Sequence, residues 1–370
     1  MEIAIGDISK EDHQAFISSL PSASFLQLPA WGAVKSDWKS KSLGIFENSS
    51  LIGVALLLKR SLPKVGKSFG YIPEGPIFLQ QYSINTEILN ALEAMAKSEQ
   101  IFLLRVGPAI PFRDWDSEII KSALASDQAS SLLRTKSTQE YEDGRTAIAS
   151  FEKSDWRAVV SESGFSEGQP NFVFQLDLRN QSEETLLADF NQLWRRNIKK
   201  ADKEGVEVFR GSRHDLADFH KVYLETAKRD NFIPRPLSYF ERMWEQLNRD
   251  ETYLKLFLAK WQGQIIASTI AIQVGNHYWY SYGASSAFGR EARGSNAIQW
   301  VMMKDALASR AACYDLRGIT PTLDPNDSHV GLIQFKVGTG GYARQLVGEW
   351  EKPISKFWSF AFATYLRIRK

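Results

Sequence analysis

Three alternating segments joined by two tight turns place the strongest constraint on how this chain folds. Apolar and polar residues alternate over residues 253–260, 265–274 and 277–282, which is the pattern of half-buried strands. Turn residues separate them at Gln262-Gly263-Gln264 and at Gly275-Asn276. Because such short connections join antiparallel neighbours, we expect a three-stranded meander here.

Segments with helical periodicity surround this meander. Two precede it, and their apolar residues are Leu216, Phe219, Val222 and Tyr223 in one, and Leu237, Phe240, Met243, Trp244 and Leu247 in the other. A third helix is expected from Ser295, and a strand follows at Tyr314-Asp315-Leu316. Two helices, three meandering strands, a helix and a strand form the element order of the GCN5-type acyltransferase (GNAT) fold.

The first half of the chain repeats this order more loosely, from a strand at Ile3-Ala4-Ile5 to a strand at residues 102–106. We therefore expect an α/β (α+β) protein of two tandem GNAT-like domains. Residues 1–176 would form the first, completed by a C-terminal helix over 346–370, and residues 177–345 the second.

Two stretches depart from the repeated order. Residues 127–145 are polar and poor in pattern, which predicts a loop with a terminal strand. Residues 350–370 are expected to form a final helix that packs on the first domain. Its apolar face would consist of Phe357, Trp358, Phe360, Ala361 and Tyr365.

Composition places the chain among ordinary globular proteins. Of its 370 residues, 44% are hydrophobic and 24% charged, and the net charge is +2, so any nucleic-acid contact must come from local clustering. The one cysteine, Cys313, excludes an internal disulfide. We find no membrane-spanning run and no signal-peptide pattern at the start, so we expect a cytoplasmic protein without stable membrane insertion, and a monomer.

The strongest local cluster of charge follows a capping residue. Ser182 begins a helix, apolar residues recur at helical spacing, and Gly205 ends it. Its outer face carries five cations, namely Arg195, Arg196, Lys199, Lys200 and Lys203. Such a strip can bind a polyanion, although charge runs on helices are often only a solvated face.

Acetyl-coenzyme A is a poor candidate for the donor. GNAT enzymes that use it hold the pyrophosphate in a glycine-rich loop after the central strand. Residues 284–295 occupy that place here and lack its spacing.

Motifs along nearly the whole chain resemble the Fem family (FemABX) of aminoacyl-tRNA-dependent peptidyltransferases, which build the interpeptide bridge of peptidoglycan. They are Pro29-Ala30-Trp31-Gly32-Ala33-Val34-Lys35, Tyr71-Ile72-Pro73-Glu74-Gly75-Pro76, Trp194-Arg195-Arg196-Asn197-Ile198-Lys199-Lys200-Ala201, Pro234-Arg235-Pro236-Leu237-Ser238-Tyr239-Phe240, Trp279-Tyr280-Ser281-Tyr282, Tyr314-Asp315-Leu316-Arg317-Gly318-Ile319 and Phe335-Lys336. No sustained heptad pattern is present, so the chain is similar to members without a coiled-coil arm.

This resemblance implies the substrates and several of their ligands. The donor would be an aminoacyl-tRNA, held by the five cations, and the acceptor UDP-MurNAc-pentapeptide or lipid II in a cleft across the first domain. Lys35 and Arg235 match positions that hold the two phosphates of the UDP-sugar. Tyr239 and Tyr282 match substrate-binding tyrosines. The ordinary alternatives are a solvated pair of cations and two core aromatics.

Lys336 is the residue that the resemblance identifies for catalysis, as a cation that stabilises the oxyanion and the leaving ribose hydroxyl. Phe335 would face the terminal adenosine of the tRNA. Two positions depart from the family: Gly107 replaces a common Asp, and Phe102, on the acceptor side, replaces a Tyr. Gly107 weakens any mechanism with an aspartate base.

No metal or other cofactor is expected, because the histidines have no ligand spacing with carboxylates or Cys313. Trp31 and Trp38 flank Lys35 and could stack on the uracil or sugar, although such pairs more often lie in a core. Two other functions stay open. One is an acyltransferase-like role in exopolysaccharide synthesis, and the other is a non-catalytic relative that binds precursor or tRNA.

Overall fold

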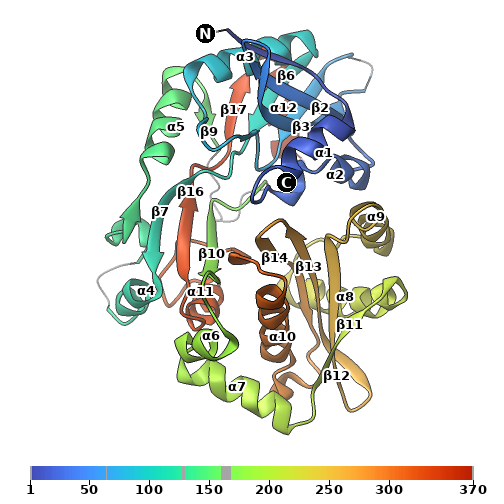
Figure 1. Cartoon of the computed structure of the whole chain (residues 1–370), viewed down its shortest axis with the longest axis vertical. Coiled ribbons are helices and arrows are strands. Elements are labelled where there is room, and N and C mark those ends of the chain that lie inside the picture. The colour runs from blue at the N-terminus through green and yellow to red at the C-terminus, as the bar shows by residue number, and fades with distance from the viewer. Residues whose placement is uncertain (1, 64, 127–129, 160–167, 369–370) are drawn as a thin grey trace. The chain divides into compact units, whose positions relative to one another are not determined.

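The computed structural model describes residues 2–63, 65–126, 130–159 and 168–368. The chain forms two compact units and contains two sheets (Figure 1). Unit 1 comprises Met1–Asp114, Gln139–Asn171 and Arg344–Lys370, and unit 2 comprises Trp115–Thr138 and Phe172–Ala343. Residues 115–138 thus group with unit 2, whereas the sequence analysis assigned them to the first domain.

Unit 1 is built on a sheet with the strand order β1-β2-β3-β4-β6-β17-β9, and β5 pairs with β3. Its one parallel pair among the described strands is β4 with β6. The strands are β1 (Ile3–Asp7), β2 (Lys39–Glu47), β3 (Ser50–Ser61), β4 (Ser68–Ile72), β5 (Ile77–Phe78), β6 (Ile101–Val106), β9 (Arg157–Ala158) and β17 (Trp350–Pro353). The helices are α1 (Lys10–Ser18), α2 (Pro29–Val34), α3 (Thr86–Ser98), α5 (Glu142–Lys153) and α12 (Lys356–Ile368).

Helix α3 shows how the sequence builds the core of unit 1. The Asn85 side chain accepts a hydrogen bond from the Ile88 amide and so caps the helix start. Ile88 and Leu92, one turn apart, are fully buried in a cluster with Leu104 of β6. A second, smaller cluster contains Phe102 of β6. Both faces of β6 are therefore covered.

Two predictions for unit 1 were wrong in part. Residues 350–370 are not one helix, because Trp350–Pro353 forms strand β17 between β6 and β9, and only Lys356–Ile368 is helical. The predicted terminal strand near residue 140 is confirmed as β8 (Gln139–Glu140), which pairs with β7 (Pro111–Asp116). However, α5 begins at Glu142, within the predicted loop.

Unit 2 contains the predicted meander. Its strands follow the order β11-β12-β13-β14-β15-β10, in which β14 and β15 run parallel. The strands are β10 (Phe172–Asp177), β11 (Glu207–Gly211), β12 (Leu254–Trp261), β13 (Gln264–Val274), β14 (His277–Ser285) and β15 (Cys313–Gly318), and β16 (Tyr342–Leu346) carries the chain back to unit 1. The helices are α4 (Ser117–Leu124), α6 (Glu183–Asp189), α7 (Gln192–Lys203), α8 (Leu216–Asp230), α9 (Leu237–Leu247), α10 (Gly294–Ala308) and α11 (Val330–Val337).

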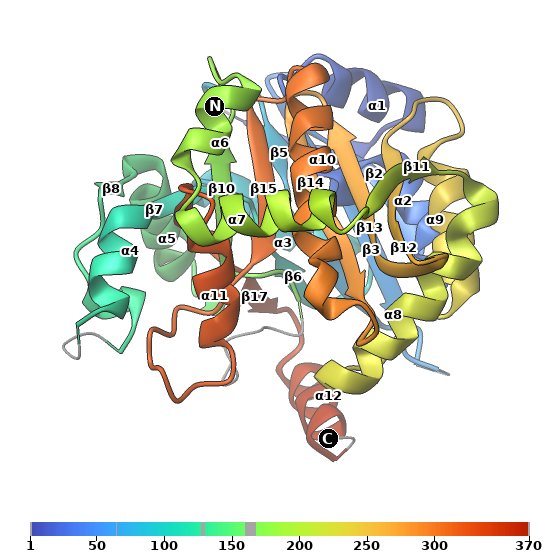
Figure 2. The same cartoon turned by 90° about the horizontal axis from the view of Figure 1, so that it is seen from below.

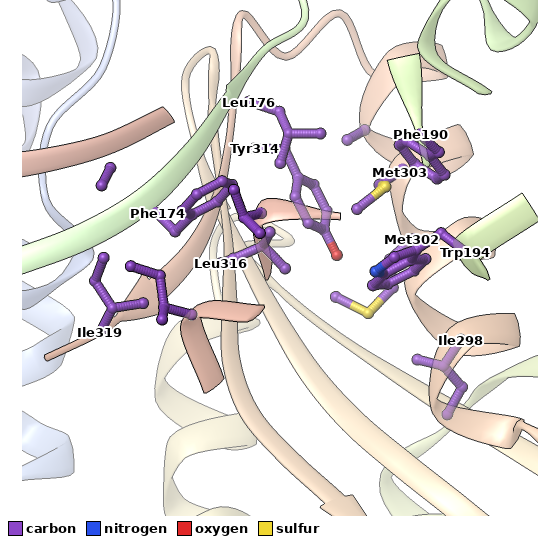
Figure 3. Packing of buried hydrophobic residues seen from close by; sticks show 14 of the residues in the cluster. Phe174, Leu176, Phe190, Trp194, Ile298, Met302, Met303, Tyr314, Leu316 and Ile319 are labelled. Carbon is purple, nitrogen blue, oxygen red and sulfur yellow. The ribbon is translucent and has the colours of Figure 1, made fainter. Parts of the chain in front are cut away.

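Helices cover both faces of this sheet. Phe257 and Ala259 of β12 belong to the cluster that α10 completes, and Leu256 and Leu258, which alternate with them, are equally buried. Helix α7 packs in turn on α10 (Figure 2). Figure 3 shows this contact: Met302 and Met303 of α10 lie beside the rings of Phe190, which precedes α7, and Trp194, which belongs to it.

The basic helix predicted over 182–205 is two helices. Phe190 adopts an extended conformation (φ −69°, ψ 143°) and ends α6, and the Asn191 side chain then accepts a hydrogen bond from the Trp194 amide to cap α7. Ser182 caps α6 as predicted. The five cations all lie on the second helix, α7.

Candidate active site

Strands β14 and β15 separate partway along their length, and this opening organises the candidate site in unit 2. Their described pairing ends at Trp279 and Asp315. Beyond that point, the backbone carbonyls of Arg317 and Gly318 need other donors, because buried peptide groups are nearly always paired. Arg317 also has a positive φ of 62°, so the strand bends sharply there.

Lys336 of α11 supplies those donors. Its Nζ donates to the carbonyl oxygen of Gly318 at 2.7 Å and to that of Arg317 at 3.2 Å. The side chain is only 4% exposed. Burial lowers the pKa of Lys336 to about 7, an effect that the charge of Asp315 opposes and that of Arg317 reinforces. Near neutral pH, this lysine therefore exchanges readily between ammonium and amine.

The carboxylate of Asp315 stabilises the bend at Arg317. Its Oδ1 accepts the Arg317 amide at 2.6 Å, and its Oδ2 accepts Gln175 Nε2 at 2.9 Å. Oδ2 also lies 3.3 Å from His277 Nε2. Although burial favours the neutral acid, His277, Arg317 and Gln175 hold the pKa of Asp315 below its usual range. A buried negative charge is thereby fixed close to the Lys336 amine.

Two tyrosines and two arginines surround the same opening. Tyr239 of α9 and Tyr282 of β14 lie with their hydroxyl oxygens 3.2 Å apart. Burial raises the pKa of Tyr282, and the charges of Arg235 and Arg317 oppose this increase. The Arg235 guanidinium stacks over the Tyr239 ring at 5.3 Å, and the side chain is exposed. The structure thus brings together Arg235, Tyr239 and Tyr282, which the sequence analysis proposed, and Arg317, which it did not propose.

Phe335, which precedes Lys336, packs against α7. Its ring centroid lies 4.7 Å from that of Trp194, and its carbonyl accepts Trp194 Nε1–H at 2.8 Å. The residue therefore fixes α11, and Lys336 with it, to the core of unit 2. Contact of Phe335 with the tRNA adenosine stays a prediction.

The five cations of α7 differ in their surroundings. Arg195 Nη1 donates to the carbonyls of Ala188 and Phe190 at 2.8 and 2.7 Å, so it closes the end of α6. Because its guanidinium binds these carbonyls, Arg195 is not part of the proposed tRNA surface. Of the other four cations, Arg196, Lys199 and Lys203 are exposed and Lys200 is half-buried.

On unit 1, Lys35 ends α2 and its Nζ lies 5.3 Å from the centroid of the Trp31 ring. Trp31 is 2% exposed and packs edge-on against Phe25, so it is a core residue and does not offer a face to a ligand. Trp38 is half-buried and packs near Phe69 and Tyr71. Of the two tryptophans, Trp38 is the one with a surface that a ligand can reach.

Trp38 also lines a groove of about 690 Å³ in unit 1. Its walls are mainly apolar and aromatic, with two guanidinium groups, and include Arg60, Leu62, Phe69, Tyr71, Arg105, Trp358 and Phe362. Apolar and aromatic walls with a few polar or charged groups are typical of sites for small organic molecules. Phe102 lies beneath this groove, fully buried against Phe362. A direct contact between Phe102 and a substrate does not fit that burial.

A buried carboxyl occupies the space beside Gly107. A Cβ atom on Gly107 would lie 2.9 Å from Glu349 Cγ, and one on Gly168 would lie 1.8 Å from Glu349 Oε2. Glu349 is 2% exposed, accepts the Tyr71 hydroxyl at 2.5 Å and lies 3.6 Å from Arg105 Nη1. Burial raises the pKa of Glu349, against the opposing effects of Tyr71 and Arg105.

Comparison with known proteins fits this geometry. A model of the FemAB family matches residues 8–263 and 252–367. The chain belongs to the FemAB family. It is 24% identical to the lipid II:glycine glycyltransferase of Staphylococcus epidermidis, with 95% of this chain and 92% of the relative aligned, and 24% identical to the Staphylococcus aureus protein of the same name, with 94% and 92% aligned.

Solved structures confirm the fold of this FemAB protein. The crystal structure of FemX superposes with a TM-score of 0.76 at 22% identity, covering 95% of this chain and 97% of that one. A tandem GNAT protein from the clavulanic acid biosynthesis pathway superposes with a TM-score of 0.55 at 9% identity, covering 96% and 99%. The predicted tandem GNAT architecture is thus confirmed, and no coiled-coil arm is evident in the described chain.

Two residues of the site were missed as functional candidates, although both stand in the quoted motif around Tyr314. Asp315 and Arg317 became visible only when the strand bend and the Lys336 contacts were known. Among the described residues, no helix is long and apolar enough to cross a bilayer, and no group of three or more His, Cys, Asp or Glu side chains is arranged to hold a metal ion.

Proposed function

We propose that this protein transfers an amino acid from an aminoacyl-tRNA to the stem peptide of a peptidoglycan precursor, UDP-MurNAc-pentapeptide or lipid II. Aminoacyl transfer is the activity of the FemAB family, and the relatives above are named for transfer of glycine to lipid II. The observation that carries the proposal is the buried Lys336 at the opening between β14 and β15. This is where GNAT folds hold the acyl group.

The reaction needs a positive charge beside the ester. The acceptor amine attacks the ester carbonyl, the C–N bond forms, the ester C–O bond breaks, and the proton lost by the amine ends on the ribose oxygen. Two hydrogens of the Lys336 ammonium bind the carbonyls of Arg317 and Gly318. The third can donate to the oxygen on which charge develops, and the rigid carbonyl anchors hold it in place before the reaction.

The remaining residues take supporting roles in this proposal. Tyr239 and Tyr282 bind the reacting groups at the mouth of the opening, and Arg235 attracts the anionic acceptor from the exposed rim. Lys35 of unit 1 is proposed by itself as a phosphate ligand. The exposed cations of α7 meet tRNA phosphates.

The test is product formation by purified protein from bulk tRNA charged with mixed amino acids and from each precursor form, followed by mass spectrometry. Lys336→Met should lower kcat by about 100-fold or more with little change in the KM for the acceptor, because the ammonium acts on charge present only in the transition state. Lys221→Met, on the exposed face of α8, is the matched control and should have wild-type activity.

Two results would remove this mechanism. One is a Lys336→Met enzyme that turns over at the wild-type rate. The other is a wild-type protein that binds the precursors and charged tRNA but forms no new amide from either, which would favour the non-catalytic alternative.

A further inference from the structure

Helix α12 has aromatic residues on both sides, although only one side faces the protein. Trp358 and Phe362 pack on the cluster of Phe69 and Phe102 and form one wall of the groove in unit 1. Phe357 and Phe360 point the other way and are 70% and 73% exposed. Figure 2 shows α12 as the helix next to the C label. A helix that is apolar all round normally has a partner on every side.

The charge of the segment indicates what that partner is. Residues 356–370 contain four basic residues and no Asp or Glu; the basic residues are Lys356, Arg367, Arg369 and Lys370. Arg60, exposed on the neighbouring wall of the groove, adds a further cation. This local excess stands out in a chain whose net charge is only +2. Exposed aromatics combined with Lys and Arg are the signature of helices that lie in a membrane interface.

We propose that the outer face of α12 docks this protein onto an anionic lipid bilayer, with Phe357 and Phe360 inserted among the acyl chains and the exposed Lys356 at the phosphate level. A second copy of the chain is the less suitable occupant, because pairing two copies of α12 would oppose two segments rich in cations. The proposal goes beyond the transfer reaction, since docking involves no substrate. It also places the groove next to the bilayer, where a lipid-linked acceptor would be found.

Binding is measured by sedimentation of the full chain with vesicles of phosphatidylcholine containing 30% phosphatidylglycerol, and with phosphatidylcholine alone. We expect binding to the anionic vesicles, weaker binding to the neutral ones, and loss of binding on raising the salt concentration. Phe357→Ser with Phe360→Ser should weaken binding by about tenfold for each ring, roughly 100-fold together. Their exposure predicts an unchanged melting temperature.

Leu224→Ser, an exposed apolar residue of α8 (43% exposed), is the matched control and should bind vesicles as the wild type does. The proposal is overturned if the wild type ignores anionic vesicles, or if the double Phe variant binds them as tightly as the control. It is also overturned if sedimentation velocity shows a dimer that the double variant dissociates, because a second copy would then cover the face. Loss of transfer activity in the Lys336→Met variant with vesicle binding retained would separate docking from catalysis.

Discussion

The pKa of Lys336 predicts a specific pH dependence of stability. In the unfolded chain this lysine titrates near 10.5, and in the folded protein near 7. Between these values the unfolded state binds more protons, so the lysine makes folding less favourable at neutral pH, and this penalty decreases as the pH rises. With these two pKa values, the penalty is about 4 kcal/mol at pH 7 and about 2 kcal/mol at pH 9.

The wild-type free energy of unfolding should therefore rise by about 2 kcal/mol between pH 7 and pH 9, relative to that of Lys336→Met. The comparison removes the other titrating groups, and any cost of leaving the Arg317 and Gly318 carbonyls without their donor is the same at both pH values. Urea denaturation of both proteins at the two pH values, followed by tryptophan fluorescence, measures the difference. Parallel pH dependences would show that Lys336 keeps an ordinary pKa in the fold and would refute the reasoning.

Three further predictions concern the cations of α7 and Tyr282. The exposed cations of α7 are Arg196, Lys199 and Lys203. Replacing all three by Gln should flatten the salt dependence of activity at sub-saturating aminoacyl-tRNA, as measured by initial rates from about 50 to 200 mM salt. Arg195→Gln should instead lower the free energy of unfolding by about 1 kcal/mol in denaturant titrations with the salt dependence of activity unchanged, because its contacts are with the end of α6. Tyr282→Phe, which removes a hydroxyl 3.2 Å from that of Tyr239, should lower kcat/KM for the acceptor about tenfold, and an unaltered kcat/KM would exclude the hydroxyl from substrate binding.

Local patterns predicted the elements of unit 2 well, because period-two alternation and capping residues act over a few residues. The run from Ser182 to Gly205 was the exception. Phe190 and Trp194 are four residues apart, so helical spacing continues across the break, while the Asn191 cap that causes it looks like any polar residue within the pattern. Strand β17 was missed for a different reason, since its conformation depends on pairing with β6, which lies far away in the sequence.

Sequence motifs pointed to Lys336 and Tyr282, and the structure places both at the opening between β14 and β15. Contacts between distant segments were not predictable. The sequence does not show that Arg195 closes α6, that Asp315 supports the bend at Arg317, or that Phe102 is sealed beneath α12. Each depends on which backbone groups and side chains the folded chain brings together, and residue type alone does not reveal this.

The space shared by Gly107, Gly168 and Glu349 constrains the order in which this protein can change over evolution. An acidic residue placed at 107 would crowd Glu349 and add a second carboxylate to one buried site, where two like charges raise each other's pKa. The same residue becomes tolerable once position 349 has been shortened. Substitutions at 107 and 349 should therefore be strongly epistatic. A path that moves the carboxylate from position 349 to position 107 should first replace Glu349 by a smaller side chain and only then introduce the acidic residue at 107.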